Sequence, residues 1–196
     1  MNQFASSSLT IGQVNALVKK LGGVEAVLKI LRDDAECTRS SMTVTLGNIR
    51  GAENFRRALS DADCLIGDTA NSLLDRPEFM LSCEDREVDT VIVSVRDLGF
   101  DGGAMRGDIY LRIAELGLFL FLGDGGPQIR LRYRSQARGE RLLVGMQPLR
   151  DASGQYRIFC VDRNENGARY LGAVNASLDY VWPANTLWIF HRNKRS

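Results

Sequence analysis

Residues 169–191 read RYLGAVNASLDYVWPANTLWIFH, and this stretch decides how the rest of the chain is interpreted. It ends in an apolar run, Leu187–Phe190, which predicts a final strand. The middle, residues 175–186, has no clear periodicity and mixes small polar residues with Tyr180 and Trp182. Aromatic side chains among Ser, Gly and Asn supply rigid contact area and adaptable hydrogen bonds. The composition fits a binding surface as well as it fits a long surface loop around a core tryptophan.

Upstream of this stretch, the sequence predicts a series of strands and one helix. The helix is expected over residues 105–116, because Ile109, Ile113 and Leu116 share one face. A tight hairpin turn is expected at 164–167, which contains an Asn-Gly pair, and another turn at 151–154. Strands are expected where β-branched or alternating apolar residues gather, at 88–95, 129–133, 142–146 and 156–161.

Residues 10–33 predict a helical hairpin. Thr10 can cap the first helix, and Gly22-Gly23 ends it as a C-terminal glycine does. Two helices joined by a glycine turn can be a packing module, or the first half of a DNA-binding helix-turn-helix. Recognition helices usually present Arg, Asn, Gln or Ser to the groove. The second helix instead exposes an acidic pair, Asp33-Asp34, and Glu25, Lys29 and Arg32, so DNA binding is kept only as the alternative.

The remainder of the N-terminal part returns mainly to helical spacing. A short strand is expected around Met42, Val44 and Leu46, and helical spacing follows over residues 51–82 until Pro77. A charged, turn-like stretch then precedes the strands. The predicted fold class is α+β, with a mostly helical N-terminal region (residues 1–85) followed by a mixed, mainly antiparallel domain (residues 86–196).

The composition is that of an ordinary globular chain, with 196 residues, 44% hydrophobic, 25% charged and a formal net charge of +1. Such a chain can bury a core, and its charge indicates no general attraction to nucleic acid or acidic lipid. No apolar run could span a membrane, and the first residues do not resemble a secretion signal. Four cysteines without Cys-x-x-Cys spacing indicate free thiols in a reducing compartment. The cytoplasm is the expected location.

Motifs with known chemistry are incomplete. The only histidine, His191, lies beside the last strand, where a sheet residue is expected rather than the base of a triad. Gly123–Gly126 is glycine-rich, but Pro127 follows it, so a turn is predicted rather than a phosphate loop. Asp162–Gly167 matches half a calcium loop, but the twelfth position is Ala173 instead of Glu. Neither enzymatic activity nor a cofactor or metal is therefore expected.

The chain resembles a group of bacterial proteins over most of its length. The likeness is carried by four segments, Leu9–Gly23, Met146–Gly154, Val161–Gly167 and Trp188–Arg192. Members of this group look like variable proteins of diversity-generating retroelements. In these systems a reverse transcriptase copies a template with errors at adenines, and the copy replaces the 3′ part of the target gene. The resemblance implies a C-type-lectin-like domain over residues 86–196 that carries variable, ligand-binding side chains.

The resemblance also implies which positions vary. Asparagine codons of the AAC type are the usual targets, and Trp182 and Trp188 match fixed tryptophans that such codons cannot produce. The register departs from the template pattern at Leu178, Ala184 and Asn185, which places each position within about one residue. Tyr170 is included because it would supply contact area. The candidate ligand-binding residues are Tyr170, Gly172, Val174, Asn175, Ser177, Tyr180, Pro183 and Thr186.

The composition of the segment agrees with this hypothesis. Lys, Glu, Gln and Met cannot arise from AAC codons by changes at the first two bases; they total 24 of 196 residues and are absent from residues 170–191. The favoured hypothesis is a non-enzymatic recognition protein for a macromolecule, in the first place a protein. The alternatives are a DNA-associated regulator that uses residues 10–33, and an enzyme whose carboxylates form no recognisable motif.

Overall fold

The structure is a computed structural model that describes residues 10–24 and 42–194. By the contacts between residues, the chain divides into two compact units, Met1–Cys37 and Thr38–Ser196. The described residues form helices and a mainly antiparallel sheet, which confirms the α+β class. Among these residues, every helix is too short or too polar to cross a lipid bilayer.

The first unit contains the helix α1 (Ile11–Lys20), which begins where the sequence predicts. Thr10 and Gln13 form a reciprocal capping box, in which the Gln13 amide donates to the Thr10 hydroxyl at 3.3 Å. Gly22 and Gly23 have φ angles of 93° and 97°, and they end the helix as expected. The predicted second helix, and with it the hairpin over 10–33, lies outside the described residues beyond Val24.

The second unit is built on an eight-stranded sheet whose strand order is β1-β3-β10-β5-β7-β8-β2, with β6 paired to β7. Within it, β3 (Arg86–Ser94) and β10 (Leu187–Asn193) pair antiparallel, from Leu187 opposite Ser94 to Asn193 opposite Val88. Therefore the two ends of the predicted 86–196 region lie side by side. The last strand also lies inside the sheet rather than at its edge.

The other strands flank this pair. On one side β1 (Thr43–Leu46) pairs with β3, and on the other β10 runs parallel to β5 (Arg141–Val144). The sheet continues through β7 (Tyr156–Arg163) and β8 (Arg169–Asn175) to β2 (Cys64–Ile66). The remaining short strands are β6 (Leu149–Arg150) and a separate ribbon of β4 (Ala104–Met105) with β9 (Val181–Trp182).

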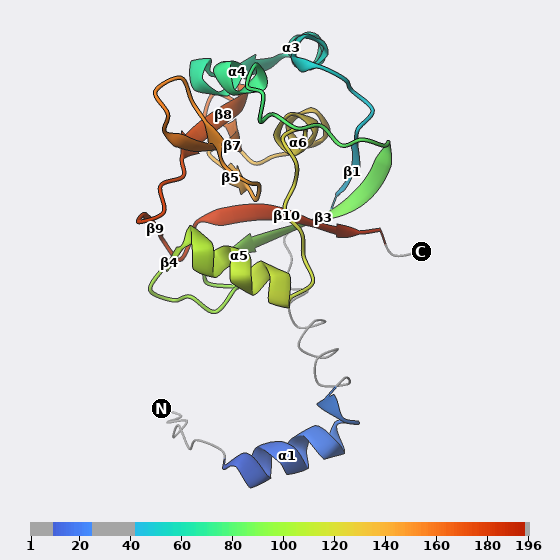
Figure 1. The fold of residues 1–196 in the computed structure, drawn as a ribbon, viewed down its shortest axis with the longest axis vertical. Helices are drawn as coiled ribbons and strands as arrows, with labels where there is room; N and C mark the ends of the chain where they lie inside the picture. Colours follow the sequence, from blue (N-terminus) through green and yellow to red (C-terminus); the bar gives the residue numbers. More distant parts are fainter. Residues whose placement is uncertain (1–9, 25–41, 195–196) are drawn as a thin grey trace. The chain divides into compact units, whose positions relative to one another are not determined.

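Helices cover both faces of the sheet. Figure 1 shows α5 (Arg106–Glu115) on one side of β3 and β10, and α6 (Gly125–Arg132) on the other together with α3 (Ala52–Asp61) and α4 (Asp68–Leu74). The predicted apolar face of α5 is confirmed at Ile109 and Ile113, which are buried, whereas Leu116 is the half-buried C-cap. The helix α3 buries Phe55 and Leu59. Burial of such faces against the sheet is the main source of stability for short helices.

The predicted strand at 129–133 is wrong, because these residues belong to α6 and its C-cap. The predicted turn at Gly123–Gly126 is also wrong, since the helix begins there. A side-chain carbon at Gly126 would lie 2.7 Å from Cβ of Phe159, so glycine permits a close approach to β7. Ile129 and Arg130 are both fully buried, and the alternation of apolar and basic residues therefore does not separate an inner from an outer face.

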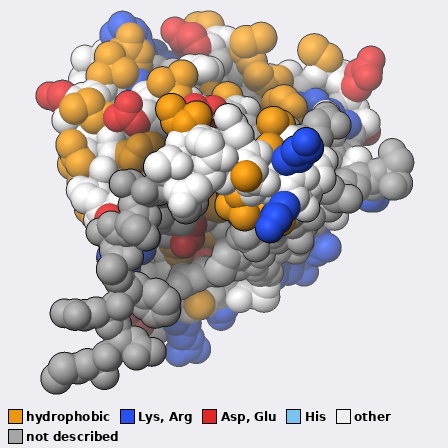
Figure 2. Space-filling model, turned by 90° about the horizontal axis from the view of Figure 1, so that it is seen from below, with side chains coloured by type: hydrophobic (Ala, Val, Ile, Leu, Met, Phe, Trp, Pro, Cys, Tyr) orange, Lys and Arg blue, Asp and Glu red, His pale blue; other side chains and the backbone are white. Residues whose placement is uncertain are grey.

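The division between the units differs from the predicted boundary at residue 85. Residues 43–74 contribute β1 and β2 to the large sheet, where β1 pairs with β3 and β2 pairs with β8. The segment therefore belongs to the same compact unit as the C-terminal strands. Figure 2 shows hydrophobic side chains among acidic and basic ones on the described part of the face that it draws. This mixture agrees with the formal net charge of +1.

Candidate ligand-binding surface

The segment that carries the candidate residues alternates between exposed and buried side chains. None of the eight candidate residues, from Tyr170 to Thr186, is buried, and Tyr180 is 49% exposed. Between and beyond them lie buried side chains that belong to the core, with Leu171 and Trp188 0% exposed and Trp182 7% exposed. The residues that the resemblance treats as exchangeable are thus separated in space from those that it treats as fixed.

The strand β8 presents Tyr170, Gly172 and Val174 on one face, because alternate residues of a strand share a face. The register places Tyr170 opposite Asp162 of β7, which lies opposite Arg141 of β5. Nε and Nη2 of Arg141 donate to the Asp162 carboxylate at 3.0 and 2.9 Å, and this bond raises the pKa of Arg141. An ion pair therefore stands beside the candidate residues of β8.

The Asp162–Gly167 segment is a hairpin turn, as the sequence predicts. The Asn164 amide donates to the Ala168 carbonyl at 3.0 Å, and the Gly167 amide donates to the Asn164 carbonyl at 2.9 Å. The Asp162 carboxylate is turned toward Arg141. In residues 10–24 and 42–194, no group of His, Cys, Asp or Glu side chains could hold a metal ion.

Three open hollows line this surface, and together they include every candidate residue except Gly172. The first, of about 540 Å³, contains Tyr170. The second, of about 410 Å³, is bordered by Trp182 and Leu187 and contains Val174, Tyr180, Pro183 and Thr186. The third, of about 440 Å³, contains Asn175 and Ser177. The first two share a wall formed by Gly139, Glu140 and Arg141, so they form one continuous surface.

Gly172 differs from the other candidates. A side-chain carbon at this position would lie 2.8 Å from Sγ of Cys160, which is 2% exposed. Burial also raises the pKa of the Cys160 thiol to about 12, so it is an unreactive core group. Replacement of Gly172 would require the Cys160 side chain to move.

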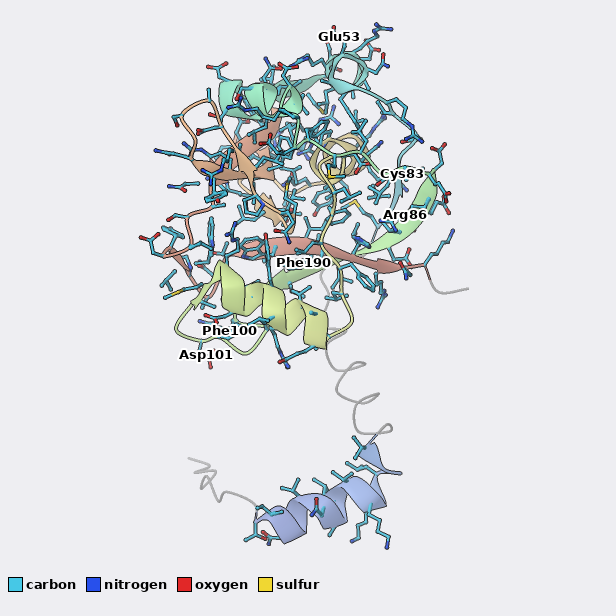
Figure 3. The ribbon with its side chains drawn as sticks, in the orientation of Figure 1. Glu53, Cys83, Arg86, Phe100, Asp101 and Phe190 are labelled. Atoms are coloured by element: carbon cyan, nitrogen blue, oxygen red, sulfur yellow. The ribbon has the colours of Figure 1, made fainter. Side chains whose placement is uncertain are left out.

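A row of aromatic rings connects the surface with the core. The rings of Tyr180 and Trp182 meet edge to face with centroids 4.7 Å apart, and Trp182 meets Trp188 in the same way at 5.3 Å. Trp188 continues the row to Tyr110 of α5 and stacks on Phe190 at 6.0 Å. Figure 3 marks Phe190 on β10 next to α5. The exposed Tyr180 ring therefore rests on a rigid base.

Hydrogen bonds to Asp151 fix the turn that forms one wall of the third hollow. The Asp151 carboxylate accepts hydrogen bonds from the Ser153 hydroxyl at 2.7 Å and from Arg157 Nε at 2.7 Å. These bonds, with the backbone amides of Ser153 and Gln155, hold the pKa of Asp151 well below its usual range. The turn at 151–154 is thus confirmed, and it fixes the position of Gln155 and Tyr156 opposite Asn175 and Ser177.

His191 is a sheet residue, as its sequence position predicts. It is 3% exposed, packs against Phe119 and Phe121, and places Nε2 3.2 Å from the Leu120 carbonyl. Burial lowers its pKa. Cys64, Cys83 and Cys160 are free, in agreement with the expected free thiols, and Cys37 lies outside the described residues.

Sequence reasoning missed the wall that the first two hollows share. Gly139, Glu140 and Arg141 are brought to β8 through β7, by pairings that local patterns do not reveal. The only local signal was an arginine at the start of a predicted strand, which is too common to identify a site. No protein-family model, curated protein or solved structure matches the chain.

Proposed function

We propose that the chain is a non-enzymatic recognition protein that displays a diversified C-terminal surface, generated by retroelement mutagenesis on a C-type-lectin-like domain. The observation that carries the proposal is the separation along residues 170–188. None of the candidate exchangeable side chains is buried, whereas Trp182 and Trp188 are 7% and 0% exposed. A protein whose binding residues are replaced repeatedly needs such a separation, since each exchange would otherwise disturb the packing of the core.

The shape of the surface favours a macromolecular partner. The three hollows are open and contiguous or adjacent along β8, whereas small-molecule sites are usually deep clefts that enclose most of the ligand. Tyr180 offers a large, half-exposed ring whose position Trp182 supports, and such rings are common anchors in protein interfaces. These features therefore favour a protein as the ligand.

The lectin-like arrangement is part of the proposal. Its support is that the region 86–196 begins with β3 and ends with β10, which pair over their lengths. When the first and last strands of a region pair with each other, a long connection such as residues 176–186 can extend from the sheet without disrupting it. The sheet contacts of β1 and β2 then attach the N-terminal residues 43–74 to this frame.

The DNA that flanks the gene tests the proposal directly. We expect a near-copy of the 3′ end of the gene, with AAC codons at the positions of Val174, Asn175, Ser177 and Tyr180 and a reverse transcriptase gene nearby. The tryptophan codons of residues 182 and 188 should be unchanged in the copy, and the part of the gene that encodes residues 43–94 should have no copy. Intact flanking DNA that contains neither a copy nor a reverse transcriptase would contradict the proposal.

A further inference from the structure

The second hollow differs from the other two in the chemistry of its lining. Its residues are mainly apolar or aromatic, and these are Leu143, Val174, Tyr180, Trp182, Pro183 and Leu187. The first hollow is lined mainly by charged residues, and the third mainly by polar ones. Of the three hollows, the second is therefore the one whose lining suits an apolar group.

Part of this lining belongs to the core and part is exposed. Leu143 of β5 is 2% exposed and lies opposite Trp188 of β10 in the sheet. Trp182 is 7% exposed and packs edge to face on Trp188. Tyr180 and Pro183, in contrast, are exposed members of the same hollow and belong to the candidate exchangeable residues. The hollow therefore combines a fixed apolar base with side chains that exchange could alter.

The charges in the second hollow balance one another. It contains one acidic residue, Glu140, and one basic residue, Arg141. The Arg141 guanidinium is already bound to the Asp162 carboxylate, with Nε and Nη2 at 3.0 and 2.9 Å from its oxygens. An anionic ligand group would compete with Asp162, and a cationic group would meet the positive charge of Arg141 beside Glu140. An uncharged apolar group meets neither obstacle and gains free energy by leaving water.

We propose that the second hollow binds a large apolar side chain, aromatic or aliphatic, of a partner protein. Its volume of about 410 Å³ lies near the lower end of the range for ligand sites, about 300–1,000 Å³, which suits one large side chain. A side chain that fills such a hollow is a common anchor of protein interfaces. This inference rests on the proposed recognition function and names the chemistry of its partner. The fixed base would keep the preference for an apolar anchor, while exchange at Val174, Tyr180 and Pro183 would change which anchor fits.

The test uses the full chain and a phage library of random linear heptapeptides. Peptides that the wild-type chain selects are synthesised with a fluorescein label, and fluorescence anisotropy measures their affinity in solution. We expect the selected peptides to share one large apolar residue, such as Trp, Phe, Leu, Ile or Met. Replacement of that residue by alanine should weaken binding at least about tenfold, and replacement of its polar neighbours should have smaller effects.

Substitutions in the chain identify the hollow that holds the anchor. Val174→Arg would place a long charged side chain in the second hollow and should weaken the selected peptides at least about tenfold. Thr186→Arg, at another residue of this hollow, repeats the test on a different strand connection. Val181→Arg is the matched control, because Val181 is 48% exposed on β9 and lines none of the three hollows. It should leave the affinity within about twofold of the wild type. Circular dichroism and thermal melting check that each variant folds.

The outcomes separate this inference from the proposed function. Selected peptides without a required apolar residue, or a library that yields no binding peptide, would overturn the inference. Unchanged affinity of the folded Val174→Arg and Thr186→Arg variants would overturn it as well. Tyr170→Arg and Ser177→Arg, in the first and third hollows, then show which statement fails. If either blocks the peptides, the recognition surface stands and only the apolar anchor is wrong; if none of the four variants affects binding, the proposed function fails.

Discussion

Replacement of Trp188 by alanine is expected to lower the free energy of unfolding by about 3–5 kcal/mol, the range for large aromatic residues removed from a core. Trp188 is 0% exposed and packs against Trp182, Tyr110 and Phe190. It also lies on an interior strand of the sheet, with Val93 opposite it on one neighbouring strand and Leu143 on the other. The cavity would therefore lie where three strands meet. Denaturation by urea, followed by circular dichroism, measures the change.

Tyr180→Ala is the matched control for this prediction. Tyr180 belongs to the same row of aromatic rings but is 49% exposed, so its removal should change the free energy of unfolding by about 1 kcal/mol or less. Similar losses for the two variants would show that Tyr180 is part of the core. In that case the division between a fixed frame and an exchangeable surface would be incorrect.

Replacement of Arg130 by alanine should have a comparable effect, about 3–5 kcal/mol, because it breaks a buried polar network. The guanidinium of Arg130 is fully buried and donates to Oε1 of Gln136, to the Tyr133 carbonyl and to the Asp162 carbonyl. Gln136 in turn donates to the carbonyls of Glu140 and Val161. Removal of Arg130 would leave several acceptors without a donor in a site that water cannot reach.

The Arg130 variant should also disturb the binding surface. The network holds the segment from Tyr133 to Glu140, and Gly139 and Glu140 form the wall shared by the first two hollows. Arg132→Ala is the control, since Arg132 lies on the same helix but is exposed and donates only to the Thr43 carbonyl among its described hydrogen bonds. Its effect should be within about 1 kcal/mol. Equal urea midpoints for the two variants would contradict a structural role for the Arg130 network.

The sequence correctly predicted the elements in which buried apolar residues recur with the period of a helix or a strand, or form a continuous run. The helix α5 and the strands β3, β7 and β10 were found because apolar residues recur on one face or in a continuous run. The helix α6 was missed because it is buried around most of its circumference, including Gly126 and Arg130. For such a helix no polar face marks the period, and a glycine-rich start resembles a turn.

Only the part of the candidate surface that is continuous in sequence was predicted. Residues 170–186 could be identified from their composition and from the family resemblance, and none of the eight candidate residues among them is buried. Arg141 could not be identified in this way, since its proximity to β8 depends on the pairing of β5 with β7 and of β7 with β8. A single arginine carries no local signal of its eventual neighbours, and only the register of the strands reveals them.

The measurement that tests the central claim most directly is the folded fraction of two displayed libraries under protease challenge. The first library randomises the first two codon bases at Tyr170, Val174, Asn175, Ser177, Tyr180, Pro183 and Thr186. The second treats the intervening buried residues Leu171, Ala176, Trp182 and Trp188 in the same way. We expect most members of the first library to resist protease like the parent, and few members of the second to do so. Similar losses in both libraries would contradict the claim that an exchangeable surface rests on a fixed frame.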